Sequence, residues 1–110
     1  RYETTVELPA GDPFDWLDCG TVDGVVTVAV NGDEVGCRYA APYRFRIAEA
    51  LRPGTNDIEL ILHNTAQNLY GPHRRLGRDA MDACEPRGAD PGKYYLARFG
   101  ISGPVRLKQP

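Results

Sequence analysis

Apolar and polar residues alternate with a period of two along most of this chain, which is typical of β-strands that have one covered face. Short runs rich in Gly, Pro, Asn and Asp separate these stretches, and such runs favour turns. The sequence shows no internal repeat and no domain boundary. Extended segments are predicted at 2–8, 14–20, 25–30, 42–47, 56–62, 94–100 and 104–107.

The segment 25–30, VVTVAV, gives the clearest strand signal. Its even-numbered residues share one face and its odd-numbered residues share the other, and neither face is charged, so we expect both faces to be covered, as in a central strand. The dipeptide Asn31-Gly32 follows directly. Both residues tolerate positive φ, which a type I′ turn requires at its two central positions. The sequence therefore predicts a tight hairpin at this point.

The next segments have one face toward water. In 43–47, Tyr43, Phe45 and Ile47 alternate with two arginines. The following stretch, 48–51, is helix-prone but too short to persist, because Pro53-Gly54 ends it. A strand is then expected from Asn56, with Ile58, Leu60 and Leu62 facing inward. The alternation in 2–8 suits an edge strand, and Asp23-Gly24 is expected to form the turn into the segment 25–30.

Three quoted stretches resemble a known family: VNGDEVG at 30–36, PYRFRI at 42–47 and LRPGTNDIELIL at 51–62. The string is similar to the sugar-binding, jelly-roll domain of the β-galactosidase and β-glucuronidase superfamily of glycoside hydrolases, family two, whose wider relatives are galactose-binding-like β-sandwiches. LDCGTV at 17–22 and GISGPVRL at 100–107 extend the resemblance over most of the chain. NLYGPHRR at 68–75 resembles an element of bacterial members.

The resemblance implies an all-β jelly-roll sandwich of about eight mostly antiparallel strands, spanning 1–110 as a single domain. It also implies a non-catalytic accessory domain, whose catalytic partner would be a separate (β/α)8 barrel of a larger enzyme. Two functions stay open at this point. The domain either contributes sugar contacts to its catalytic neighbour, or packs against that neighbour as a structural module without sugar affinity of its own.

Size and charge limit the alternatives. A chain of 110 residues is one domain, near the small end for burying a core. Its net charge is −2, with no basic stripe along the sequence, so we expect neither nucleic acid nor an anionic membrane as a partner. No apolar run reaches the length of a membrane span. Because the chain starts at Arg1 without a targeting sequence, we expect a fragment of a longer protein, cytoplasmic or secreted.

Catalysis by this chain alone is not expected. Glycoside hydrolysis needs two carboxyl groups about 5 to 10 Å apart, one with a raised pKa. The acids here fall in turns or on solvent-facing positions, without a convincingly apolar setting. A hydrolytic triad lacks a plausible nucleophile, because the single serine, Ser102, lies between glycines in an expected turn.

Cysteines and acids suggest no cofactor. Cys19, Cys37 and Cys84 are an odd number without a CxxC pair, so we expect reduced thiols, with Cys19 a small core residue. A bridge between Cys19 and Cys37 would need adjacent strands. Related sandwiches often bind a structural calcium ion, but no loop spacing specifies such a site among the available acids. Those acids are Asp12, Asp15, Asp18 and Asp23.

Candidate sugar contacts gather after the strand at 56–62. Saccharides are held by aromatic faces and by planar amide, carboxylate or guanidinium groups. The amides here could equally satisfy loose backbone groups at a strand end, and Trp16 could either stack on a sugar or cover a sheet face. The stretch 65–93 is polar and lacks a period, so a long loop is expected there. The candidate ligand residues are Asn64, Asn68, Tyr70, His73, Arg74 and Arg75.

Overall fold

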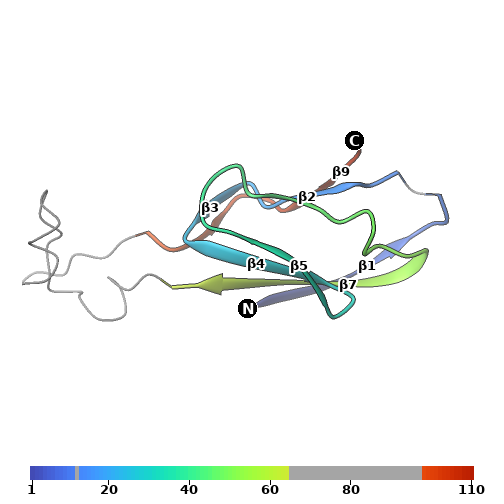
Figure 1. Ribbon diagram of the computed structural model, residues 1–110, viewed down its shortest axis with the longest axis horizontal. Helices are drawn as coiled ribbons and strands as arrows, with labels where there is room; N and C mark the ends of the chain where they lie inside the picture. The colour runs from blue at the N-terminus through green and yellow to red at the C-terminus, as the bar shows by residue number, and fades with distance from the viewer. Residues whose placement is uncertain (12, 65–97) are drawn as a thin grey trace, which may run out of the picture. The chain divides into compact units, whose positions relative to one another are not determined.

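The structure is a computed structural model that describes residues 1–11, 13–64 and 98–110. Its regular elements in these residues are all β-strands, as the alternating sequence predicts (Figure 1). One compact unit contains 1–63 and 99–110, and a second unit, 64–98, lies almost entirely outside the described residues. The strands are β1 (Tyr2–Leu8), β2 (Trp16–Asp18), β3 (Thr21–Asp23), β4 (Val25–Val30), β5 (Asp33–Arg38), β6 (Arg44–Arg46), β7 (Gly54–His63), β8 (Gly100–Ser102) and β9 (Arg106–Lys108).

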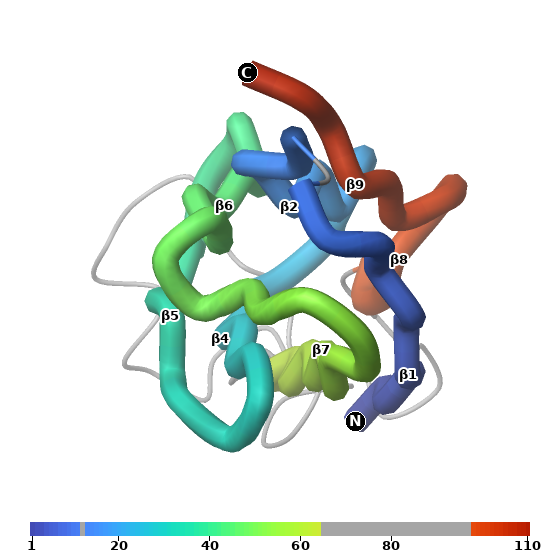
Figure 2. The backbone as a smooth tube through the Cα atoms, turned by 90° about the vertical axis from the view of Figure 1, so that its right-hand side faces the viewer, coloured from blue at the N-terminus to red at the C-terminus, as the bar shows by residue number. Residues whose placement is uncertain are grey.

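The described strands form three antiparallel sheets, of which the two larger ones pack face to face around one core and the third is the pair β3-β8. The larger sheet has the order β1-β7-β4-β5, and the smaller has the order β6-β2-β9. Seen end-on, β6, β2 and β9 lie above the four strands of the larger sheet, with β6 over β5 (Figure 2). Both sheets supply buried residues to a single cluster: Leu17, Cys19, Val22, Val26, Val28, Val30, Tyr43, Phe45, Ile47, Ile58 and Leu60.

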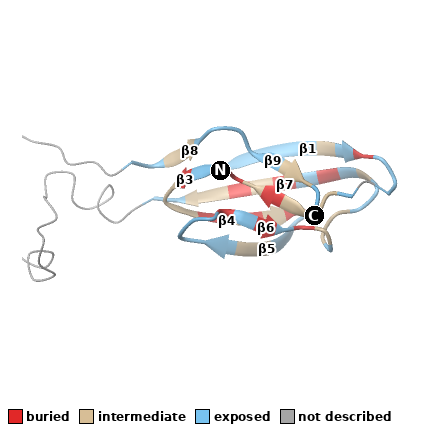
Figure 3. Ribbon diagram, turned by 90° about the horizontal axis from the view of Figure 1, so that it is seen from above, coloured by how far each residue is buried: buried red, intermediate tan, exposed pale blue. Residues whose placement is uncertain are grey.

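Strand β4 is central, as its uncharged faces predict. It lies between β7 and β5, and its three even-numbered valines are fully buried. The tight turn after it is also confirmed, because Asn31 has φ 54° and Gly32 has φ 89° and the strands on either side pair as a hairpin. Edge strand β1 is mostly exposed, whereas burial concentrates in β4 and β7 (Figure 3).

Some boundaries differ from the sequence-based prediction. Thr21–Asp23 forms a strand of its own, β3, which pairs with β8, and a bend at Gly24, with φ 129°, leads from it into β4. The prediction that Ser102 lies in a turn was wrong, because Ser102 ends β8 opposite Thr21. Of the segment expected at 94–100, residues 94–97 lie outside the described residues, Arg98 and Phe99 precede the strand, and Gly100 begins it. These strands have only three residues each, too few for a sequence period to show.

Candidate functional site

Five of the six predicted ligand residues lie outside the described residues, as does the expected loop at 65–93. These five are Asn68, Tyr70, His73, Arg74 and Arg75. Asn64 is described and exposed, just after the end of β7. Beside it, the imidazole Nε2 of His63 lies 3.0 Å from the hydroxyl of Thr27 on the neighbouring strand β4. The candidate sugar contacts after β7 therefore stay a prediction.

Two asparagines from the family-like stretches, Asn31 and Asn56, are hydrogen-bonded to each other. The side-chain amide of Asn31, in the hairpin turn, donates to Oδ1 of Asn56 at 3.0 Å and to the carbonyl of Ala50 at 2.9 Å. Asn56 is fully buried; it also accepts from the Arg52 amide and donates to the carbonyls of Arg52 and Gly54. Its hydrogen-bonding capacity is thereby filled. These residues fix the turn and the start of β7.

The outer face of the smaller sheet is rich in positively charged side chains. Trp16 in β2 stands opposite Arg46 of β6 on one side and Lys108 of β9 on the other. Asp18 likewise stands between Arg44 and Arg106. Residues directly opposite in an antiparallel pair share a face. We call this surface the cationic face; it consists of Trp16, Asp18, Arg44, Arg46, Arg106 and Lys108.

Asp18 anchors two of these cations. Its Oδ2 accepts from the Lys108 ammonium and, at 3.1 Å, from Nε of Arg44, while its Oδ1 accepts from the Gly20 amide at 2.9 Å. The hydrogen bond from Lys108, followed by the one from Gly20, lowers the pKa of Asp18 to about 2. The Asp18 side chain is only 14% exposed. The carboxylate is therefore held ionised in a fixed position and is unsuited to act as a general acid.

A surface hollow of about 500 Å³ adjoins the cationic face. Trp16 and Arg44 line it. The end of β5 and the connection to β6 line it as well, and include Arg38 and Tyr39. Tyr39 is 83% exposed, and the Arg38 guanidinium lies 5.8 Å from the ring centre of Phe45. Two aromatic residues and two arginines thus line one hollow. Trp16 is half-buried, so part of its ring system stays accessible.

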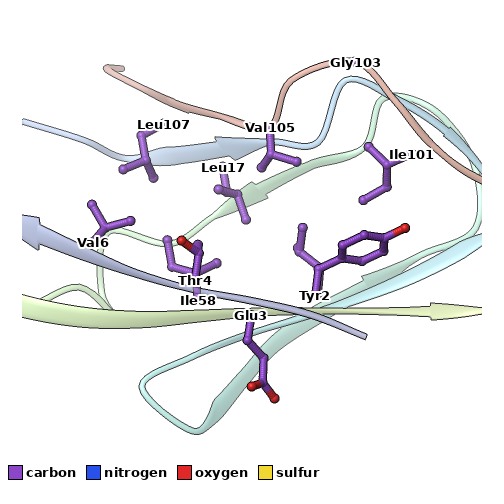
Figure 4. Close-up of a pocket in the computed structure, with 11 residues that line it drawn as sticks. Tyr2, Glu3, Thr4, Val6, Leu17, Ile58, Ile101, Gly103, Val105 and Leu107 are labelled. Atoms are coloured by element: carbon purple, nitrogen blue, oxygen red, sulfur yellow. The ribbon is translucent and has the colours of Figure 1, made fainter.

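An apolar groove of about 630 Å³ runs along the other side of the sandwich, between β1 and the β8–β9 segment. Tyr2, Ile101, Val105 and Leu107 project into it, whereas Glu3 points away (Figure 4). Core residues Leu17, Ile58 and Leu60 also line it. Strands β5 and β6 are consecutive and are joined by residues 39–43, whereas within the described residues no connection joins β1 directly to β9 across the groove.

The two cysteines that the structure describes lie in different surroundings, and the described acids form no metal-binding cluster with them. Cys19 is fully buried, and its burial raises the pKa of the thiol to about 11, so it stays protonated and unreactive. Cys37 is exposed, and both thiols are free; Cys84 lies outside the described residues. Among residues 1–11, 13–64 and 98–110, no group of three or more His, Cys, Asp or Glu could hold a metal ion. Asp12 lies outside these ranges.

Among the described residues there is no helix of the length and hydrophobicity needed to cross a membrane.

Two solved structures are similar to this chain. A rhamnosidase from Novosphingobium sp. PP1Y matches with 31% sequence identity and a TM-score of 0.69, over 96% of this chain and 10% of the rhamnosidase chain. A β-D-mannosidase from Dictyoglomus thermophilum matches with 20% identity and a TM-score of 0.64, over 98% of this chain and 15% of its own. The second likeness shows the fold alone. Neither the scan of protein-family models nor the search of curated proteins found a match.

The comparison with the rhamnosidase defines the class of domain. This chain matches a small part of a large glycosidase in sequence as well as in fold, and it spans about a tenth of that enzyme's length. The similar segment of the mannosidase is also a small part of its chain. The chain is therefore an all-β domain of a kind that occurs within glycoside hydrolases.

Proposed function

We propose that this chain is a non-catalytic accessory domain of a larger glycoside hydrolase, and that it contributes to substrate binding or to the shape of the active-site region. The observation that supports this most directly is the match of 96% of the chain to 10% of the rhamnosidase at 31% identity. The partner would be the catalytic domain of the same polypeptide. In this proposal Asp18 is not a general acid, because its hydrogen bond from Lys108 lowers the pKa of its carboxyl to about 2.

The finer assignment belongs to the same proposal. The hairpin after β4 and the Asn31–Asn56 hydrogen bond join the stretches by which the sequence resembles the galactose-binding-like jelly roll of family two enzymes. A bacterial origin fits this resemblance. The packing of two antiparallel sheets supports a sandwich of this type.

The test starts from the gene that encodes this chain. We expect its open reading frame to encode a glycosidase catalytic domain as well. Deleting residues 1–110 from the encoded protein should then lower kcat/KM on its glycoside substrate by about tenfold or more, because domain contacts that position substrate contribute a few kcal/mol. The chain by itself should show no turnover of aryl glycosides. An open reading frame without a glycosidase domain would contradict the proposal.

The apolar groove favours a second candidate function, a structural packing module without sugar affinity. Its lining includes Tyr2 at 55% and Val105 at 38% exposure, and apolar surfaces of this kind often mark interfaces. Replacing Val105 with Asp in the full-length enzyme would separate the two functions. A purely structural domain predicts that the melting temperature of the neighbouring domain falls while sugar binding by this chain stays undetectable. A binding domain predicts saturable sugar binding that this substitution leaves unchanged.

A further inference from the structure

We propose that the cationic face and the hollow beside Trp16 form a binding site for an acidic saccharide, one whose sugar rings carry uronate carboxylates. This inference rests on the proposed function, because it names the ligand class for a domain of the glycoside hydrolase type. The sequence pattern did not suggest it: the cations come from two strands, β6 and β9, that lie 60 residues apart along the chain and that the fold places on either side of β2.

The charge of this face is opposite to that of the whole protein. At its paired positions the described residues place four cationic side chains against one carboxylate, that of Asp18, while the chain as a whole has a net charge of −2. Asp18 binds Arg44 and Lys108. Within the described residues, no ion pair links Arg46 or Arg106 to an acid, and both side chains are exposed. Two guanidinium groups are thus available to a carboxylate from outside, which they can bind through two parallel hydrogen bonds.

The aromatic groups explain why a saccharide fits this face. Trp16 stands in the middle of the cationic face, between Arg46 and Lys108, and also lines the hollow with Tyr39. Indole and phenol faces pack against the C–H surface of a sugar ring, while planar cations bind its acidic groups. A ring stacked on Trp16 would place its substituents toward Arg46. The occupant we infer is therefore an anionic sugar chain.

Intrinsic fluorescence measures this binding directly, because Trp16 is the single tryptophan of the chain. We expect trigalacturonate to change the emission of Trp16 in a saturable way. The matched control ligand is the fully methyl-esterified trigalacturonate, which keeps the sugar rings and loses the negative charges. Its affinity should be weaker by roughly tenfold or more, since the ester cannot form the charge-assisted hydrogen bonds that a carboxylate forms with guanidinium groups.

Variants locate the site. Arg46→Gln and Arg106→Gln should each lower the affinity for trigalacturonate by roughly tenfold. Arg1→Gln is the matched control: it also removes one positive charge, but Arg1 binds Glu3 and Glu59 on the larger sheet, so the affinity should stay within about twofold. Calorimetry with Trp16→Phe should show weaker binding, and circular dichroism should confirm that each variant keeps its β-structure.

Several outcomes would overturn the inference. Equal affinity for the acid and its methyl ester would remove the role of the cations. The absence of a saturable response to either ligand would exclude the site. A stronger response to poly-glutamate or to a single-stranded oligonucleotide than to trigalacturonate would assign the face to an acidic protein or to nucleic acid. None of these results bears on the deletion test of the proposed function, so the two can fail separately.

Discussion

The inner and outer faces of the three-stranded sheet β6-β2-β9 are built from the same short strands, yet they differ in polarity and in charge. The inner residue of each strand, Leu17, Phe45 or Leu107, packs toward the core. The outer residues are the tryptophan, the aspartate and the four cations of the cationic face. Because side chains alternate along a strand, the strand pairing that turns the apolar residues toward the core also turns the charged residues toward solvent. Stability should therefore depend on the inner face, and ligand binding on the outer one.

The largest effect is expected from truncating the inner face. Leu17→Ala should lower the free energy of unfolding by about 3 kcal/mol, because Leu17 is only 2% exposed and the substitution removes buried methyl groups and leaves a cavity. Urea denaturation measures this change. Val105→Ala, at a position 38% exposed on the groove, is the control and should cost less than about 1 kcal/mol. Equal losses at the two positions would show that the sheet does not cover a core.

A buried polar group should rank second. Asn56→Ala removes the side chain that binds Asn31, Arg52 and Gly54, and leaves their backbone and amide groups without these partners inside the protein. We expect a loss of about 2 kcal/mol in the free energy of unfolding. Thr55→Ala, one residue earlier in β7 and exposed, should change it by less than about 0.5 kcal/mol. If both variants unfold at the same urea concentration, the Asn31–Asn56 pair does not stabilise the turn.

The sequence predicts the position and inward face of most strands better than it predicts how the strands pair. Strand β4 and the Asn31-Gly32 hairpin follow from local rules, since six alternating residues and a turn dipeptide determine them. The inward direction of Phe45, Ile58 and Leu60 follows equally from alternation. In contrast, β3, β8 and β9 have three residues each, and their pairing depends on partners far away along the chain. The cationic face could not be predicted for the same reason, because pairing between β2 and β9 is a property of the fold.

The candidate ligand residues illustrate a different limit. Their prediction rests on chemical type, which gives no geometry, and all of them but Asn64 lie outside the described residues: Asn64, Asn68, Tyr70, His73, Arg74 and Arg75. Asn31 and Asn56 have the same amide chemistry but satisfy backbone groups and each other. The sequence leaves two roles open for Trp16, stacking on a sugar or covering a sheet face. Trp16 is half-buried where it lines the hollow, so part of its side chain is covered and part can contact a ligand.

On the outer face, the charge of Asp18 should matter moderately and in a pH-dependent way. Asp18→Asn should lower the free energy of unfolding by about 1 kcal/mol near neutral pH, because it removes the ionic bonds to Lys108 and Arg44. The pKa of Asp18 is lowered in the folded protein, from 3.8 to about 2. Its stabilising effect is therefore complete above about pH 4 and is lost as the pH falls toward about 2.

Urea denaturation of wild-type protein and of Asp18→Asn over this pH range tests the linkage. The difference in unfolding free energy should shrink as the pH decreases through about 4 and approach zero below about pH 2. Asp57→Asn is a useful comparison, since that carboxylate, on β7, accepts a hydrogen bond from the Thr5 hydroxyl and lies away from the cationic face. A difference for Asp18→Asn that stays constant down to pH 2 would show that the ionised carboxylate does not stabilise the fold.

The smallest effect on stability is expected at the cations that Asp18 does not bind. Arg46→Gln should change the free energy of unfolding by less than about 0.5 kcal/mol, because the side chain is exposed and makes no ion pair within the described residues. The substitution also removes one of four neighbouring positive charges, and the relief of their repulsion opposes any loss of packing by the aliphatic part of the arginine side chain. The same variant is expected to lose roughly tenfold in affinity for trigalacturonate. A large stability loss with unchanged affinity would reverse the division between the two faces, since Arg46 would then support the sheet instead of a ligand.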